Sequence, residues 1–385
     1  MSRENLEQIY YHALDKVKAD KIVRENLACE EEGLVIRDKC IPWNSFKNLY
    51  VFSVGKAGYD MAKECERILQ DHIYYGVCVS LSDQKLQFMK ACQSSHPILS
   101  KKSIKSGEAL LETMETMSKD DFFIFFLSGG ASAMIEKPVD NITLEDFQKI
   151  SQALIGSGVD IKALNSVRKS ISAIKGGKLA NVVKAEGITL VLSDVIGDDL
   201  DVIGSAPMNN GRFEHQIIGN NRIALKGAKE FIENIFELDS VDIVTNILDM
   251  DSQRSAEYIV TKMKAYDEKY ESYCLLFGGE TTTEIIGDGI GGRNQELALR
   301  LLLQDCIDER TSILCAGSDG IDGNSPATGA FLDFELLQKI KEEGIDPKSF
   351  LQNSDSYSFF KALGYDFTIG VTGTNVMDFI IVIKQ

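Results

Sequence analysis

The sequence contains few prolines and few histidines, and it has no long apolar run. Its 385 residues include 6 prolines and 4 histidines. The prolines form no Pro-rich linker, and the histidines do not have the spacing of a zinc site. No segment approaches the roughly 18 continuous apolar residues that a membrane-spanning helix requires. We therefore expect neither a zinc centre nor contact with a membrane.

Positive charge is also scarce. The chain has 41 Lys and Arg against 58 Asp and Glu, which gives a formal net charge of -17 at pH 7. Proteins that coat nucleic acid need a positive surface to replace counterions, so we expect no nucleic-acid partner. An acidic chain can still bind a small anion, but only at a site built for it.

The chain lacks the signs of export and of disulfide bonding. Its eight cysteines include no CxxC pair, and most lie among apolar neighbours. A chain of this length can bury a core without covalent staples, so free thiols are expected. The first residues, Met1-Ser-Arg-Glu-Asn, lack a basic start followed by an apolar stretch and do not form a signal peptide. We therefore expect a cytoplasmic protein.

What is present is a globular composition, with 44% hydrophobic and 26% charged residues. The length suggests about two or three domains. Short apolar runs predict strands at 49–54, 74–80, 122–127, 188–192, 241–245, 273–277, 313–316 and 379–383. Amphipathic spacing predicts helices at 4–20, 58–70, 103–117, 143–155, 161–174, 221–235, 252–269 and 293–305.

This alternation predicts an α/β fold with two α/β domains. Continuous apolar strands separated by helices are typical of a parallel sheet covered on both faces. We place the boundary near residue 230, at the transition to a charged, irregular segment. Residues 1–230 are then an N-terminal Rossmann-like domain with a parallel sheet, and residues 231–385 are a smaller C-terminal α/β domain.

Three polar segments follow buried strands of the first half: Lys56, the segment 128–132, and Asp194. Right-handed crossovers place the carboxyl ends of parallel strands along one edge, where open α/β sheets bind ligands. Convergence of three segments at that edge is the first indication of a functional site.

The segment Ser128-Gly129-Gly130-Ala131-Ser132 has the composition of an anion-binding loop. Without Cβ atoms, its backbone N–H groups can approach an anion, and the following helix presents its positive end. A tight strand-to-helix turn without a ligand is the alternative interpretation. The loop is neither a Walker A loop nor a Rossmann GxGxxG fingerprint.

Lys56 and Asp194 are candidate charged groups beside this loop. Small residues flank Lys56, which favours close approach, although a solvated turn lysine is the commoner case. Asp194 could hold Mg²⁺ through water or accept a proton from a hydroxyl. Its alternative is an acidic loop that caps the next segment.

Arg293 follows four glycines within residues 287–292 and opens a predicted helix. A basic residue is disfavoured at a helix N-terminus, which makes an anionic ligand there more plausible than a surface role. The planar guanidinium could clamp a carboxylate or a phosphate. The glycines could also let the loop move during domain closure.

Ten short motifs together resemble the glycerate 2-kinase family, whose C-terminal half is the MOFRL domain. They keep the family's order over about residues 54–378: Val54-Gly-Lys-Ala, Leu127-Ser-Gly-Gly-Ala-Ser, Lys175-Gly-Gly-Lys-Leu-Ala, Leu192-Ser-Asp-Val-Ile-Gly-Asp, Ile218-Gly-Asn-Asn, Phe277-Gly-Gly-Glu-Thr-Thr, Gly291-Gly-Arg-Asn-Gln-Glu, Ser318-Asp-Gly-Ile-Asp-Gly, Asn353-Ser-Asp-Ser-Tyr and Thr372-Gly-Thr-Asn-Val.

The resemblance implies an active site in the cleft between two α/β domains, where ATP and Mg²⁺ serve to phosphorylate D-glycerate, usually to 2-phosphoglycerate. The family's conserved catalytic residues fall on Lys56, Asp194 and Arg293, with Asp194 also the metal ligand. Nucleotide and phosphate binding fall on Ser128, Gly129, Gly130, Ser132 and Lys175. The substrate and its surroundings fall on Glu280, Asn294, Asp319 and Asn375. A homodimer is compatible with the resemblance.

Two segments depart from the family pattern, at residues 202–208 and at residues 369–375, where a proline is missing. These departures affect the prediction of the exact substrate more than the prediction of the fold. Two other functions stay open at this point. One is hydroxypyruvate reduction, although no dinucleotide fingerprint is present. The other is a non-catalytic protein that closes its two domains on a small anion.

Overall fold

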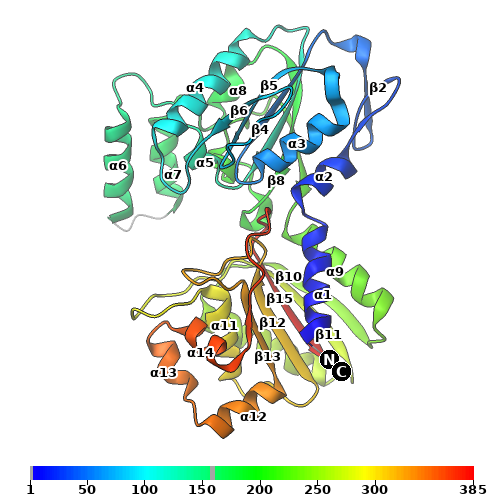
Figure 1. Ribbon diagram of the computed structural model, residues 1–385, viewed down its shortest axis with the longest axis vertical. Coiled ribbons are helices and arrows are strands. Elements are labelled where there is room, and N and C mark those ends of the chain that lie inside the picture. Colours follow the sequence, from blue (N-terminus) through cyan, green and yellow to red (C-terminus); the bar gives the residue numbers. More distant parts are fainter. Residues whose placement is uncertain (1–2, 157–160) are drawn as a thin grey trace. The chain divides into compact units, whose positions relative to one another are not determined.

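The computed structural model describes residues 3–156 and 161–385, and it divides the chain into two compact units (Figure 1). One unit runs from Lys18 to Gly219. The other combines the described residues up to Val17 with Asn220–Gln385. This division differs from the expected split at residue 230, because the first helix belongs with the second half of the chain.

The unit of residues 18–219 contains a six-stranded, fully parallel sheet with the order β6-β5-β4-β7-β8-β9. Its strands are β4 (Leu49–Val54), β5 (Ile73–Ser80), β6 (Lys90–Gln93), β7 (Phe122–Ser128), β8 (Glu186–Leu192) and β9 (Glu214–Gly219). In chain order this is the 3-2-1-4-5-6 arrangement of the Rossmann fold. The strand order therefore reverses between β4 and β7, which is where such sheets bind ligands.

Helices accompany this sheet. They are α2 (Ala19–Asn26), α3 (Gly58–Leu69), α4 (Lys101–Thr116), α5 (Ala131–Met134), α6 (Leu144–Gly156), α7 (Ile161–Ser170) and α8 (Lys178–Asn181). Strands β4 and β7 continue into α3 and α5 through short loops. Helix α3 packs on β4, β5 and β7, and α4 packs on β5 and β6. A small antiparallel sheet, β1 (Leu27–Cys29), β2 (Gly33–Ile36) and β3 (Lys39–Pro42), completes the unit.

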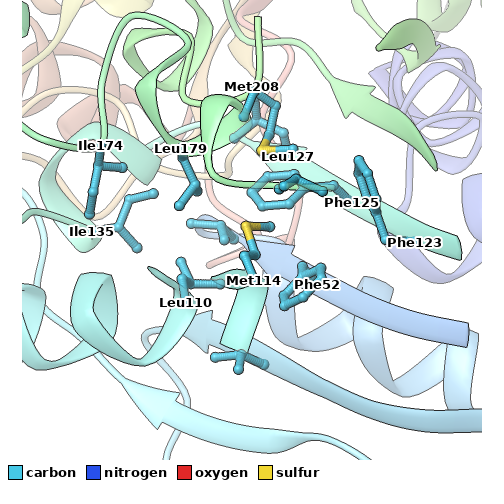
Figure 2. Close-up of a cluster of buried hydrophobic side chains, with 14 of the residues drawn as sticks. Phe52, Leu110, Met114, Phe123, Phe125, Leu127, Ile135, Ile174, Leu179 and Met208 are labelled. Carbon is cyan, nitrogen blue, oxygen red and sulfur yellow. The ribbon is translucent and has the colours of Figure 1, made fainter. Parts of the chain in front are cut away.

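The core of this unit fills the space between one face of the sheet and the helices on that face. Figure 2 shows Phe52 of β4 and Phe125 of β7 in one cluster with Leu110 and Met114 of α4. The rings of Phe52 and Phe125 lie 6.2 Å apart. Because these strands are buried along their whole length, their carboxyl ends are held as rigid supports for the loops that follow.

The second unit contains a six-stranded mixed sheet with the order β10-β11-β15-β12-β13-β14. Its strands are β10 (Ser240–Leu248), β11 (Tyr273–Gly279), β12 (Thr311–Gly317), β13 (Gly329–Asp333), β14 (Asp366–Phe367) and β15 (Asp378–Lys384). Only β10 and β11 pair in parallel in the described sheet, because β15 inserts antiparallel between β11 and β12. The strand–helix alternation predicted this α/β composition but not the reversed direction of the last strand.

The helices of the second unit are α1 (Arg3–Asp15), α9 (Asn221–Ile235), α10 (Ser252–Asp267), α11 (Arg293–Leu302), α12 (Phe334–Glu343), α13 (Pro347–Gln352) and α14 (Ser356–Leu363). The apolar face of α1 packs against α9, and Tyr10 Oη donates to the carbonyl oxygen of Gly317 at 2.8 Å. The packing of α1 on α9 makes this unit discontinuous in sequence. Helical periodicity predicted α1 but did not show which element it packs against.

Two expectations about the whole chain can be compared with the structure. All eight cysteines are free thiols, as expected. In the described part of the chain, no helix combines the length and the apolar character needed to cross a membrane.

Candidate active site

The loops after β4 and β7 are joined at the point where the strand order reverses. The backbone N–H of Lys56 donates to the carbonyl oxygen of Gly129 at 2.9 Å. The backbone N–H of Ala57 donates to Ser128 Oγ at 3.2 Å. These bonds place the Lys56 turn directly against the Ser-Gly-Gly loop, and the Lys56 side chain is exposed to solvent.

Asp194, which follows β8, meets the same loop. A Cβ atom built on Gly129 would lie 1.8 Å from Asp194 Oδ2 and 2.4 Å from its Cγ. Glycine is therefore required at position 129, because the carboxylate occupies the space of any side chain. The expectation that Lys56, the 128–132 segment and Asp194 converge from three strands is confirmed.

The Asp194 carboxyl is only partly exposed. Burial raises its pKa above the ordinary value, and the nearby Lys56 ammonium opposes the rise. When ionised, the Asp194 carboxylate places a negative charge close to the Lys56 ammonium at the end of β8. It can accept a proton or contribute an oxygen ligand to a hard cation.

Gly130 sits in the left-handed region (φ 83°) and opens α5, which is only four residues long. A Cβ atom at this position would lie 3.0 Å from the His96 ring and 3.1 Å from Lys56 Cγ. Burial lowers the pKa of the His96 imidazole below its ordinary value, and the Lys56 ammonium lowers it further. Because α5 is so short, anion binding here depends on the loop's own N–H groups more than on a helix dipole.

Ser132 and Lys175 lie beside a cavity of about 440 Å³ that adjoins Gly130. Ser132 Oγ lies 2.7 Å from Ser205 Oγ. Ser205 belongs to the segment 202–208, which departs from the family pattern. The Lys175 ammonium is only 1% exposed and forms a buried ion pair with Glu136, which also accepts from Ser172 Oγ. The charge of Lys175 is thus neutralised within the protein.

Arg293 begins α11 in the other unit, as predicted, and two carboxylates hold its guanidinium. Nε and Nη2 donate to the two carboxylate oxygens of Asp378 at 2.7 and 3.0 Å, and Nη1 donates to Glu280 Oε1 at 2.6 Å. Burial opposes the charge of Arg293, but Asp378 and Glu280 outweigh it and raise the pKa of the guanidinium. Of its five N–H donors, these bonds leave two for a ligand.

The loop before Arg293 is held by neighbouring segments. The N–H of Gly289 donates to the carbonyl oxygen of Asn353 at 3.0 Å, and the N–H of Gly291 donates to Asn324 Oδ1 at 2.8 Å. A cavity of about 560 Å³ lies beside this loop, with Glu280 and Arg293 among its lining residues. Whether the loop moves stays a prediction, but the glycines already serve its close packing.

Asn294, Asp319 and Asn375 lie on different segments of the same unit, and Asn294 directly follows Arg293 in α11. Asn294 Nδ2 donates to Asp322 Oδ1 at 3.2 Å and to Asp378 Oδ1 at 3.0 Å, and its own Oδ1 is buried without a partner in the described part of the chain. Asp319 Oδ1 accepts the N–H of Ile321, and Asn375 Oδ1 accepts the N–H of Met377, both as turn caps.

One carboxylate of this cluster, Asp378, was not predicted from the sequence, and Asp322, which lies in the motif Ser318-Asp-Gly-Ile-Asp-Gly, was not assigned a role there. Asp378 opens β15 and is 1% exposed, and Asp322 accepts the N–H groups of both Asn294 and Gln295. Burial raises the pKa of Asp322, and those two amides oppose the rise. The only signal for Asp378 in the sequence was its position at the start of an apolar strand. The sequence does not link Asp378 to Arg293, which lies 85 residues away.

Two known domain families match the chain. The domain of unknown function DUF4147 matches residues 5–216, and the MOFRL family matches residues 273–378.

Full-length relatives match as well. D-glycerate 2-kinase of Thermotoga maritima is 32% identical, over 95% of this chain and 97% of its own length. Glycerate 2-kinase of Pyrococcus horikoshii is 31% identical, over 96% of this chain and 91% of its own length. The crystal structure of a glycerate kinase from Thermotoga maritima matches with a TM-score of 0.89 and 31% identity, and the match covers 99% of each chain.

Proposed function

This chain belongs to the glycerate 2-kinase family, and from that premise we propose its reaction and the residues that carry it. It is a phosphotransferase that phosphorylates D-glycerate with ATP, at O2, to give 2-phosphoglycerate. The observation that supports this most strongly within the chain is the meeting of Lys56, the Ser-Gly-Gly loop and Asp194 at the reversal of strand order. Phosphoryl transfer needs positioning and charge neutralisation, and these groups supply both.

We propose that the phosphates of ATP bind at the loop after β7. The exposed ammonium of Lys56 would neutralise charge on the transferred phosphoryl group, and the N–H groups of Gly129 and Gly130 would hold its oxygens. Ser128 and Ser132 would support the loop through their hydroxyl groups. Lys175 is proposed to act through its buried ion pair with Glu136, which fixes the chain beside the loop.

The donor chemistry at Asp194 fits Mg²⁺ that arrives with ATP. In the described residues, no three His, Cys, Asp or Glu side chains lie close enough to form a metal site. Mg²⁺ in kinases usually needs only one or two carboxylates, with phosphates and water as the other ligands. Asp194 is the carboxylate that we propose for this role, or alternatively for accepting the proton of the glycerate hydroxyl. The bound cation would supply neutralisation of phosphate charge.

Arg293 is the catalytic residue that we propose in the second unit. Its bidentate edge is used by Asp378, so two remaining N–H groups would meet the anionic reactants. Glu280, Asn294, Asp319 and Asn375 are proposed to shape the surroundings of Arg293. A site in the cleft between the two domains, a homodimer and a cytoplasmic location stay predictions.

The two other functions have less support. The relatives from Thermotoga maritima and Pyrococcus horikoshii carry kinase names, and the turn after β4 reads Gly55-Lys56-Ala57-Gly58 without a dinucleotide fingerprint. A non-catalytic binding protein would need no carboxylate beside the loop.

The test is steady-state formation of ADP by the purified protein. We expect ADP to form only when D-glycerate, ATP and Mg²⁺ are all present. Oxidation of NADH by hydroxypyruvate is measured in parallel. NADH oxidation without ADP formation would replace the kinase assignment by a reductase assignment. The absence of both reactions would favour a binding protein.

A further inference from the structure

The cavity of about 440 Å³ in the unit of residues 18–219 has a distinct composition. Gly130 and Ser132 of the loop after β7 are among its lining residues. Apolar residues, Ile98 and Phe147 among them, form part of the wall, while Ser151 of α6 and Arg168 of α7 add polar groups. The cavity therefore continues from the proposed phosphate loop into a mixed apolar and basic space.

Two donors in this cavity have no hydrogen-bond partner among the described residues. Arg168 Nε and Ser151 Oγ are both buried, and neither makes a hydrogen bond with the described residues. The other cationic group of the lining is the Lys175 ammonium, which Glu136 neutralises in a direct ion pair. Glu136 also attracts Arg168 at longer range, but no ion pair joins the two in the described chain. Among the described residues, Arg168 therefore presents to the cavity a guanidinium that no carboxylate pairs directly.

An unpaired buried donor is costly, so its presence points to a ligand that pairs with it. A guanidinium presents parallel N–H groups that match a carboxylate, and a hydroxyl can bond to a second oxygen of the same ligand. A neutral purine base would leave the charge of Arg168 unanswered. A small hydroxy acid would satisfy both orphan donors.

We propose that this cavity is the acceptor site, in which Arg168 binds the carboxylate of the hydroxy acid and Ser151 bonds to one of its oxygens. The proposal rests on the proposed kinase function. Arg168 is better suited than Arg293 to bind the carboxylate of D-glycerate. Asp378 already occupies the bidentate edge of Arg293.

The position of the cavity suits this role. His96 and Lys56 both lie within about 3 Å of the Cβ position of Gly130, and His96 and Gly130 also line the cavity. An acceptor bound at Arg168 would thus lie in the same cavity as the loop proposed to hold the phosphates.

The test compares Arg168→Gln and Arg168→Lys with the control Lys149→Gln. Lys149 is an exposed residue of α6, so its replacement removes a positive charge nearby without touching the cavity. Full-length enzyme is used, and thermal unfolding checks that each variant is folded. The measurements are KM for D-glycerate, KM for ATP, and calorimetric binding of D-glycerate alone. D-Glyceramide, which lacks the carboxylate charge, serves as a second acceptor.

Arg168→Gln should raise KM for D-glycerate by about 10- to 100-fold, the range for losing a hydrogen bond to a charged group. KM for ATP and the activity with D-glyceramide should change little, and Arg168→Lys should recover part of the loss. If a variant has no turnover, loss of glycerate binding in the calorimeter supports the proposal and retained binding overturns it. If Arg168→Gln does not fold, Arg168→Lys decides by the same readouts.

The failures of the two proposals are distinguishable. Wild-type protein without glycerate-dependent ADP formation would refute the kinase function itself. Active wild-type protein whose Arg168 variants change KM for ATP alone would assign the cavity to the nucleotide. Unchanged values for both substrates would show that Arg168 contacts neither of them.

Discussion

At the scale of single residues, the proposed chemistry depends on charged side chains with very different surroundings. Lys56 is exposed, Asp194 is partly buried against a glycine, and Arg293 is held by two carboxylates. An exposed lysine can follow a moving phosphoryl group, whereas a fixed arginine supplies charge at one place. These differences lead to distinct expectations for Asp194 and Arg293.

Replacement of Asp194 by Asn should lower turnover and stabilise the protein at neutral pH. Burial raises the pKa of Asp194 in the folded state above the ordinary value of 3.8. The folded protein therefore loses stability as the pH rises from the unfolded-state pKa through the folded-state pKa. The neutral amide avoids that loss, so the advantage of the variant should be largest at pH 7 to 8 and should shrink toward acidic pH.

Thermal unfolding and turnover of both proteins between about pH 5 and 8 check this expectation. Near-normal turnover of Asp194→Asn at saturating Mg²⁺ would show that the carboxylate is dispensable. A variant that is less stable than wild type at pH 7 would contradict the account of its burial.

Replacement of Arg293 by Lys should be poorly tolerated although the charge is kept. A lysine cannot bond both oxygens of the buried Asp378 and still reach Glu280 or a reactant. We expect a loss of about 2–5 kcal/mol in transition-state stabilisation, the range for truncating a buried charged pair.

Arg300→Lys is the matched control, because Arg300 lies on the same helix and forms an ion pair with Glu296. It should affect stability alone. The measurement is kcat/KM with D-glycerate for both variants. Wild-type efficiency of Arg293→Lys would make the arginine a structural helix-start residue.

At the scale of elements, the sequence predicted strands such as β4 and β7 and missed others, among them β6, β9 and the buried strand β13. β4 and β7 are buried along their length and appear as continuous apolar runs. β6 and β9 are edge strands with partly exposed residues, so no such run marks them. The convergence of three strand ends could be predicted from the α/β pattern, because parallel strands share one edge. The pairing of Arg293 with Asp378 could not be predicted in this way, because it depends on the direction of β15.

The turn after β7 gives a prediction at this scale. Gly129→Ala would put a Cβ atom 1.8 Å from Asp194 Oδ2, so the loop or the carboxylate must shift. We expect a loss of about 1–3 kcal/mol in stability from overpacking, together with strongly reduced turnover. Gly156→Ala is the control, since a Cβ atom there would meet no other part of the described chain within 4 Å. Chemical unfolding and ADP formation are measured for both, and wild-type behaviour of Gly129→Ala would contradict the contact with Asp194.

At the scale of the whole molecule, the two units have separate cores and a discontinuous chain. Helix α1 and helix α9 belong together in the second unit, so a cut at residue 230 would pass through α9. Sequence composition indicated two domains but could not reveal that the N-terminal helix packs with the second half. The boundary thus depends on a tertiary contact.

A fragment of residues 18–219 should fold alone and unfold cooperatively, because it contains its complete sheet and core. A fragment of residues 1–230 should be less soluble, since it carries α1 and part of α9 without the sheet on which they pack. Circular dichroism and thermal unfolding of the two fragments check this. A stable 1–230 fragment beside an unfolded 18–219 fragment would contradict the assignment of α1.

The central claim is the transfer of phosphate from ATP to O2 of D-glycerate. Phosphorus NMR of a reaction that contains the protein, MgATP and D-glycerate tests it most directly, because it identifies the product as well as its formation. The account predicts loss of the γ-phosphate signal of ATP and growth of the signal of 2-phosphoglycerate. A signal of 3-phosphoglycerate, or inorganic phosphate without a phosphoglycerate, would contradict it.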